Sequence, residues 1–167
     1  MKLAMVPAGG RVIVTRRVEG EQERMVDRAQ EIVLSVKPIW ADLIMSGRKT
    51  VELRRRFPRL SGGKVTALLY STSPVMAMVG IVHIEDTIIL PPDELWQHVA
   101  AHACVTESQY QAYFQGAKEA AALFLGTPIP LPAPIPLGLL RASANFAPPM
   151  SWRRAKPAEL ELVRELV

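Results

Sequence analysis

Three ionisable residues that could do chemistry lie close together in the sequence: Lys49, Glu52 and Arg54. Lys49 and Arg54 can both donate hydrogen bonds to phosphate oxygens or to nucleobase acceptors. Glu52 and Arg54 are two positions apart, so a strand would place their side chains on one face. Glu52 could then accept a hydrogen bond from a nucleobase amino group, or act as a general acid or base. Taken alone, the spacing favours a plain salt bridge in which Glu52 and Arg54 only orient each other.

The positive charge of the chain is concentrated around these residues. The 167 residues include 20 basic and 16 acidic side chains, which gives a net charge of +4. Residues 1–64 carry 14 basic and 7 acidic side chains, whereas residues 65–167 carry 6 and 9. Seven cations lie between Arg48 and Lys64, where Glu52 is the only acid. This distribution indicates an anionic partner, although charges that protect a sheet edge explain it equally well.

The hydrophobic pattern places the three residues where a helix gives way to a strand. Residues 31–36 form a short apolar run typical of a buried strand, and Pro38 suits the first turn of a helix that ends at Gly47. Residues 50–55 then alternate between apolar and charged side chains, as a strand with one buried face does. Lys49 should therefore lie in the turn before this strand, near the rim of the fold.

Further candidates for ligand contact lie at strand ends. Lys37 follows the first strand and is either close to the same cleft or an ordinary exposed lysine. Arg55 should point away from Arg54 on a regular strand, toward a nucleic-acid backbone or toward solvent. Tyr70 and Ser71 end another predicted strand, where Tyr70 could stack on a base or be a half-buried core tyrosine.

One more candidate lies near the C-terminus, where Trp152 precedes Arg153 and Arg154. An aromatic ring beside cations suits single-stranded nucleic acid, and the simpler explanation is a tryptophan that closes the core. His98 and His102 share a helix face but lack a clear third ligand, so the sequence indicates no metal site and no cofactor.

The rest of the chain predicts an α+β fold. Strands are predicted over residues 65–71, 76–84 and 119–125, and helices over residues 91–103 and 106–115. Gly80 inside a strand indicates a bulge or a close backbone approach. Five prolines within residues 127–136 predict an extended surface segment through which no regular ladder runs. Short strands mixed with short helices favour a small mixed β-barrel with flanking helices over a doubly wound sheet.

One domain is predicted over residues 31–155, with an N-terminal extension over 1–30 and a final helix or strand over 156–167 packed on the domain. The single cysteine, Cys104, excludes an intramolecular disulfide framework. The apolar runs are too short to cross a membrane, and the first residues do not read as a secretory signal. We therefore expect a cytoplasmic protein.

Gly47, Lys49, Glu52 and Arg54 read as G-x-K-x-x-E-x-R. This pattern resembles the signature of the ASCH domain, the activating-signal-cointegrator homology domain of the PUA-like superfamily. Other motifs in the same order resemble that family: Leu34–Pro38, Trp40, Leu69–Pro74, Val79–Gly80 and Pro148–Trp152. The resemblance implies a PUA-like barrel with a cleft around the G-x-K-x-x-E-x-R segment. Its members are mainly RNA-binding proteins or RNA-linked regulators, and a few are ribonucleases or amidohydrolases of acetylated cytidine.

The leading hypothesis is therefore a protein that binds RNA or a modified nucleotide in a basic cleft and acts as a regulator, for example of transcription. The candidate binding residues are Lys37, Lys49, Glu52, Arg54, Arg55, Tyr70, Ser71, Trp152 and Arg153. The alternative is an enzyme on the same cleft, a ribonuclease or an N4-acetylcytidine amidohydrolase, with Lys49 and Glu52 as catalytic residues. The amidohydrolase relatives are expected to carry threonine where this chain has Glu52. A third alternative is a domain that binds only protein partners.

Overall fold

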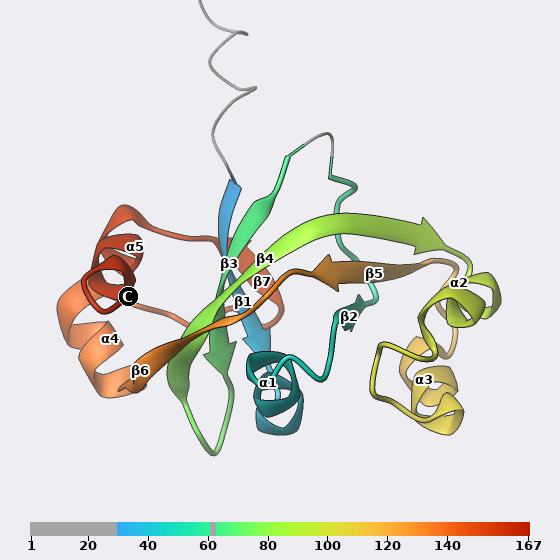
Figure 1. Cartoon of the computed structure of the whole chain (residues 1–167), viewed down its shortest axis with the longest axis horizontal. Coiled ribbons are helices and arrows are strands. Elements are labelled where there is room, and N and C mark those ends of the chain that lie inside the picture. The colour runs from blue at the N-terminus through green and yellow to red at the C-terminus, as the bar shows by residue number, and fades with distance from the viewer. Residues whose placement is uncertain (1–29, 61–62) are drawn as a thin grey trace, which may run out of the picture.

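The computed structural model describes residues 30–60 and 63–167, so the predicted N-terminal extension lies outside the described residues except for Gln30. Strands and helices alternate irregularly along the chain (Figure 1). The elements are β1 (Gln30–Val36), α1 (Pro38–Met45), β2 (Val51–Arg54), β3 (Val65–Ser71), β4 (Ala77–Leu90), α2 (Pro92–Val99), α3 (Glu107–Phe114), β5 (Ala120–Leu125), β6 (Ile129–Pro136), α4 (Leu137–Ala144), β7 (Trp152–Arg154) and α5 (Pro157–Arg164).

The strands form one mixed sheet in the order β2-β5-β4-β3-β1-β7, and β6 adds a second partner to β4. The β1–β3 pair is parallel, and the other pairs are antiparallel. The predicted α+β class is confirmed. The predicted barrel is too strong a description, because within the described residues no backbone ladder joins the ends of this path, β2 and β7. Side chains bridge that gap instead: Arg54 reaches Ser151, and Phe57 packs on Trp152.

Helices cover the sheet in three places, and each place has its own apolar cluster. On β1, Ile32 and Leu34 join the cluster under α1, whereas Val33 faces the cluster under α4 and α5. Because both faces of β1 are covered, the strand is an almost continuous apolar run. A third cluster joins α2 and α3 to β2 and β5. In Figure 1 the α2–α3 pair and the α4–α5 pair therefore lie at opposite ends of the sheet.

Local sequence signals explain where the helices begin and end. Pro38 opens α1, and Gly47 follows its end with a φ of +73°, which glycine adopts without strain. The Thr106 hydroxyl accepts a hydrogen bond from the backbone of Gln109, whose side chain bonds back to Thr106, so α3 starts with a capping box. Residues 157–164, which the sequence left open between helix and strand, form helix α5.

The proline-rich segment is extended and mostly exposed, as predicted, and no regular ladder runs through it, because its pairing with β4 is interrupted between Pro130 and Ile135. The sequence did not predict that both ends of the segment pair with β4, so that residues 129–136 form β6. The prolines occupy every second position, so they alternate with residues that keep their N–H groups. An edge strand turns only alternate N–H groups toward its partner, and the other positions can be proline without loss of a ladder bond. The prolines therefore permit pairing at both ends of β6 without a continuous ladder between them.

Gly80 confirms both features predicted from its place in a strand. The pairings of β4 with β3 and with β6 both shift between Met78 and Gly80, so Val79 lies opposite no residue of β3. A Cβ atom at Gly80 would collide with the Met45 sulfur and would lie 2.7 Å from the Ile129 carbonyl oxygen. Only glycine lets β6 and α1 approach β4 so closely.

We therefore expect Gly80→Ala to destabilise the fold by about 1–3 kcal/mol, because the backbone of β6 has to shift. Gly138→Ala is the matched control, since a Cβ there meets no atom within 4 Å and lies in helix α4. The control should be neutral or stabilising by up to about 1 kcal/mol. Urea denaturation of both variants measures the difference, and equal stabilities would contradict the close-approach explanation.

Candidate functional site

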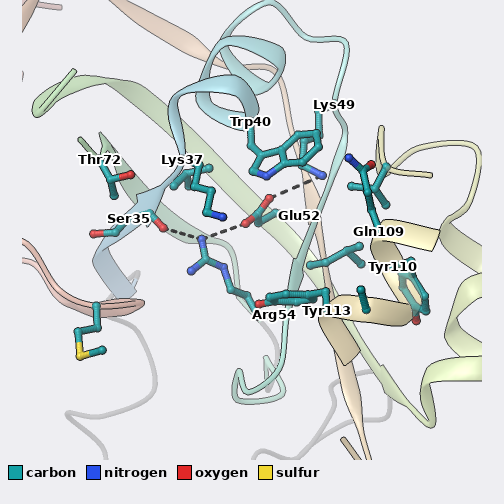
Figure 2. A pocket seen from close by; sticks show the side chains of 15 residues that line it. Ser35, Lys37, Trp40, Lys49, Glu52, Arg54, Thr72, Gln109, Tyr110 and Tyr113 are labelled. Atoms are coloured by element: carbon teal, nitrogen blue, oxygen red, sulfur yellow. Dashed lines mark hydrogen bonds and ion pairs between the residues drawn. The ribbon is translucent and has the colours of Figure 1, made fainter. Parts of the chain in front are cut away.

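A cavity of about 580 Å3 lies where the end of β1, the start of α1, strand β2 and helix α3 meet. Figure 2 shows its lining side chains. Its ionisable lining groups include Lys37, Lys49 and Arg54, with Glu52 as the acid among them. The three ionisable residues of the G-x-K-x-x-E-x-R segment, Lys49, Glu52 and Arg54, thus line one cavity, as the sequence analysis expected of a cleft. We call this cavity the Lys49 pocket.

The centre of the Lys49 pocket is an ion network around Glu52. One carboxylate oxygen of Glu52 lies 2.9 Å from Arg54 Nη2, and the other lies 3.7 Å from Lys49 Nζ. Lys49, Glu52 and Arg54 are only 3%, 6% and 8% exposed. Their alternation on β2 explains this placement, because Val51 and Leu53 pack into the cluster of α2 and α3 while Glu52 and Arg54 take the other face. Two buried cations share one carboxylate, so the network carries an excess positive charge.

Lys49 is fixed by contacts from three parts of the chain. Its backbone N–H donates to Leu43 O at 2.9 Å, and its ammonium group donates to Ala103 O in the segment that joins α2 to α3. The ammonium also lies 5.2 Å from the centre of the Trp40 ring, within cation–π range. Burial lowers the pKa of Lys49 below 10.5, and the neighbouring Glu52 carboxylate opposes that shift without cancelling it.

Arg54 connects β2 to the two segments on the far side of the pocket. Its Nη2 donates to Ser35 O at 2.8 Å, and its Nη1 donates to Ser151 Oγ at 3.2 Å. Ser35 is itself bound through its hydroxyl to Pro149 O at 2.7 Å. Arg54 Nε is buried and has no hydrogen-bond partner among the described residues. A buried donor without a partner costs free energy, and an anionic ligand could satisfy it.

Helix α3 supplies the opposite wall, which the sequence analysis missed. Gln109, Tyr110 and Tyr113 line the cavity, and Tyr113 is 44% exposed. Tyr110 is buried and donates to Pro92 O at 2.7 Å, and burial raises the pKa of its hydroxyl to about 12. In Figure 2 the rings of Trp40 and Tyr113 border the ion network. The spacing of these α3 residues was a signal of a shared helix face, but nothing local showed that the face meets Glu52.

Four candidates lie away from the Lys49 pocket for reasons that strand geometry explains. Tyr70 is buried against Phe146, with ring centres 5.2 Å apart, because it faces the α4–α5 side of β3. Ser71 is buried beside it and does not line the pocket. Trp152 and Arg153 point to opposite faces of β7: Trp152 packs on Phe57, and Arg153 forms a bidentate pair with buried Glu159 at 2.7 and 2.9 Å.

The other two candidates, Arg55 and Lys37, border the pocket in different ways. Arg55 points away from Arg54, as expected, and donates to Tyr113 O at 2.6 Å and to Gln115 O at 3.3 Å. It thereby holds the C-terminal end of α3, where helix carbonyls lack partners. Lys37 is exposed and lines the pocket rim.

The described part of the chain has neither a metal-binding cluster nor a membrane-spanning helix. Residues 30–60 and 63–167 contain no group of three His, Cys, Asp or Glu side chains placed to hold a metal ion. None of the helices described for these residues combines the length and the apolar character needed to cross a membrane.

Residues 34–129 match the ASCH domain, and this chain belongs to the ASCH domain family. A protein of Zymomonas mobilis called ASCH domain-containing ribonuclease is 36% identical over 133 residues, which cover 78% of this chain and 88% of the relative. The crystal structure of ASCH from Zymomonas mobilis superposes with a TM-score of 0.76 at 34% identity and covers 84% of this chain and 98% of the other. A Pseudomonas putida structure with 15% identity and a TM-score of 0.51, covering 81% and 97%, shares the fold alone.

We expect Glu52→Gln to lower the free energy of unfolding by about 3–5 kcal/mol, because it leaves two buried cations without a counter-charge. The matched control is Glu85→Gln, which removes an exposed pair with Lys64 at 3.2 Å and should cost less than about 1 kcal/mol. Urea denaturation near neutral pH compares them. A loss for Glu52→Gln no larger than that of the control would contradict a buried ion network.

The lowered pKa of Lys49 predicts how stability depends on pH. Between its folded pKa and the unfolded value of 10.5, the unfolded state binds more protons, so the free energy of unfolding should rise with pH there. Lys49→Met lacks the titrating group and should not show that rise. The difference in unfolding free energy between the two proteins, followed from about pH 7 to about pH 10, measures the effect. A difference that stays constant or moves in favour of the variant would contradict the assignment.

Proposed function

We propose that this chain binds single-stranded RNA in the Lys49 pocket and cleaves it there. The observation that carries the proposal is the buried network in which Lys49 and Arg54 share the carboxylate of Glu52. The network combines an excess positive charge, which suits a phosphate, with a proton donor and a proton acceptor side by side. The Zymomonas relative that is named a ribonuclease supports the same substrate class.

Binding would use the cations and the rings of the pocket. Arg54 offers its unpartnered Nε to a phosphate oxygen, and Lys37 adds a cation at the rim. Trp40 and Tyr113 present aromatic faces on which an unpaired base can stack. Single-stranded RNA fits this arrangement better than a duplex does, because a base inside a duplex cannot enter a cavity.

Cleavage would proceed by attack of the 2′-hydroxyl on the adjacent phosphorus. Glu52 accepts the 2′-hydroxyl proton, since a carboxylate keeps acceptor capacity beyond its two ion pairs. Lys49 donates a proton to the departing 5′-oxygen, and the lowered pKa of Lys49 makes it a stronger acid than an exposed lysine. Arg54 stabilises the charge that develops on the phosphate. The products are a 2′,3′-cyclic phosphate and a free 5′-hydroxyl.

The test is cleavage of a 5′-labelled, unstructured RNA, with and without a chelator, beside a parallel incubation with N4-acetylcytidine. We expect a cyclic-phosphate ladder that the chelator leaves unchanged and no release of cytidine. Release of cytidine without RNA cleavage would favour the amidohydrolase instead. Tight RNA binding without cleavage would contradict the ribonuclease and favour the regulatory role predicted from the sequence.

Substitutions at Lys49 separate its proton from its charge. Lys49→Arg keeps the charge but does not donate a proton near neutral pH, so we expect cleavage to fall at least about 100-fold. Wild-type cleavage should also decline with rising pH at a value below 10.5, as Lys49 loses its proton. The control is Arg141→Ala, because Arg141 is an exposed arginine on α4 that does not line the Lys49 pocket. Full activity of Lys49→Arg would refute the acid role.

A further inference from the structure

A second cavity of about 380 Å3 begins where β2 ends, and we call it the Trp152 cavity. Its walls come from the segment after β2, from β4, from the start of β5 and from β7. The lining residues that matter here are Arg55, Arg56, Phe57, Glu119 and Trp152. None of them lines the Lys49 pocket, and the proposed cleavage uses none of them.

The two cavities are neighbours along both strands that border the gap in the sheet. Arg54, the last residue of β2, lines the Lys49 pocket, and the two residues that follow the strand, Arg55 and Arg56, line the Trp152 cavity. On the other side, Met150 lines the first cavity and Trp152 the second. Two residues span at most about 7 Å of extended chain, and this short step would let neighbouring nucleotides of one strand reach both cavities.

The side chains of the Trp152 cavity provide what one nucleotide needs. The Trp152 ring packs against Phe57, with ring centres 5.1 Å apart and planes at 54°, and remains partly exposed to the cavity. Arg56 is exposed and makes no hydrogen bond or ion pair with any described residue, so its guanidinium group is available to a phosphate. Arg55 adds a second positive charge, although its donors are used by α3 carbonyls.

Glu119 is the acidic residue that lines this cavity, and its carboxylate would favour some nucleobases over others. Its exposed carboxylate can accept a hydrogen bond from an exocyclic amino group, which cytosine and adenine carry and uracil lacks. Its charge also reduces the attraction for a phosphate near it, so the phosphate should lie on the side of Arg56.

We propose that the Trp152 cavity holds the nucleotide adjacent to the one in the Lys49 pocket, with its base against Trp152 and its phosphate at Arg56. This proposal rests on the proposed RNA function and specifies its substrate as a strand of at least two unpaired nucleotides. Affinity should therefore depend on strand length.

The experiment measures binding of a cytidine mononucleotide 3′-phosphate and of a 2′-deoxy-substituted tetranucleotide that the protein cannot cleave. We expect the tetranucleotide to bind at least about tenfold more tightly, since stacking of one more base contributes on this scale. Arg56→Ala should remove most of that advantage, leave mononucleotide affinity unchanged and reduce the slope of log affinity against log salt by about 0.7. Arg141→Ala, an exposed arginine on α4 outside both cavities, is the matched control.

Trp152 needs two variants because it also packs on the core. Trp152→Phe should keep most of the length advantage and Trp152→Leu should lose it, while thermal melts show that both are folded. Equal affinity of the wild type for both probes, or an Arg56→Ala loss equal on both, would overturn the second site but leave the Lys49 pocket intact. No binding of either probe would overturn both proposals.

Discussion

The architecture around the pocket depends on the ion pairs that the Glu52 carboxylate forms with Lys49 and Arg54. Removing charges from water costs several kcal/mol for each ion, so Lys49 and Arg54 can be buried only because they share this acceptor. Each cation also donates a hydrogen bond to a backbone carbonyl far away in sequence: Lys49 to Ala103 O, and Arg54 to Ser35 O. One acid thereby positions β1, β2 and the connection between α2 and α3 relative to one another.

The open edge of the sheet explains why this network can border a cavity. Within the described residues no backbone ladder joins β2 to β7, and side-chain contacts hold the two strands in its place. A closed barrel would have filled this seam with paired backbone and packed side chains. Here both cavities border the gap between β2 and β7: Arg54 and Met150 line the Lys49 pocket, and Arg55 and Trp152 line the Trp152 cavity.

Local signals predicted much of this arrangement and long-range packing decided the rest. The pattern around Lys49, Glu52 and Arg54 was readable because one turn and one strand position all three. The wall from α3 was not, because its approach to β2 depends on a cluster assembled from residues far apart in sequence. Strand alternation separated Trp152 from Arg153, and strand register allowed the prolines of β6. Closeness in sequence therefore predicted which side chains meet when they share one face of an element. It was misleading for neighbours on a β-strand, whose side chains point to opposite faces.

The excess positive charge of the pocket couples ligand binding to protonation. In the ligand-free protein, burial lowers the pKa of Lys49 because Glu52 compensates for only part of the lost hydration. A phosphate placed beside Arg54 would supply the missing negative charge and keep Lys49 protonated until the 5′-oxygen departs. The departing oxygen takes that proton in the bound complex, and Lys49 regains a proton from solvent after the products leave. The imbalance that costs stability in the free protein is thus the property that would make the same lysine both a binding group and an acid.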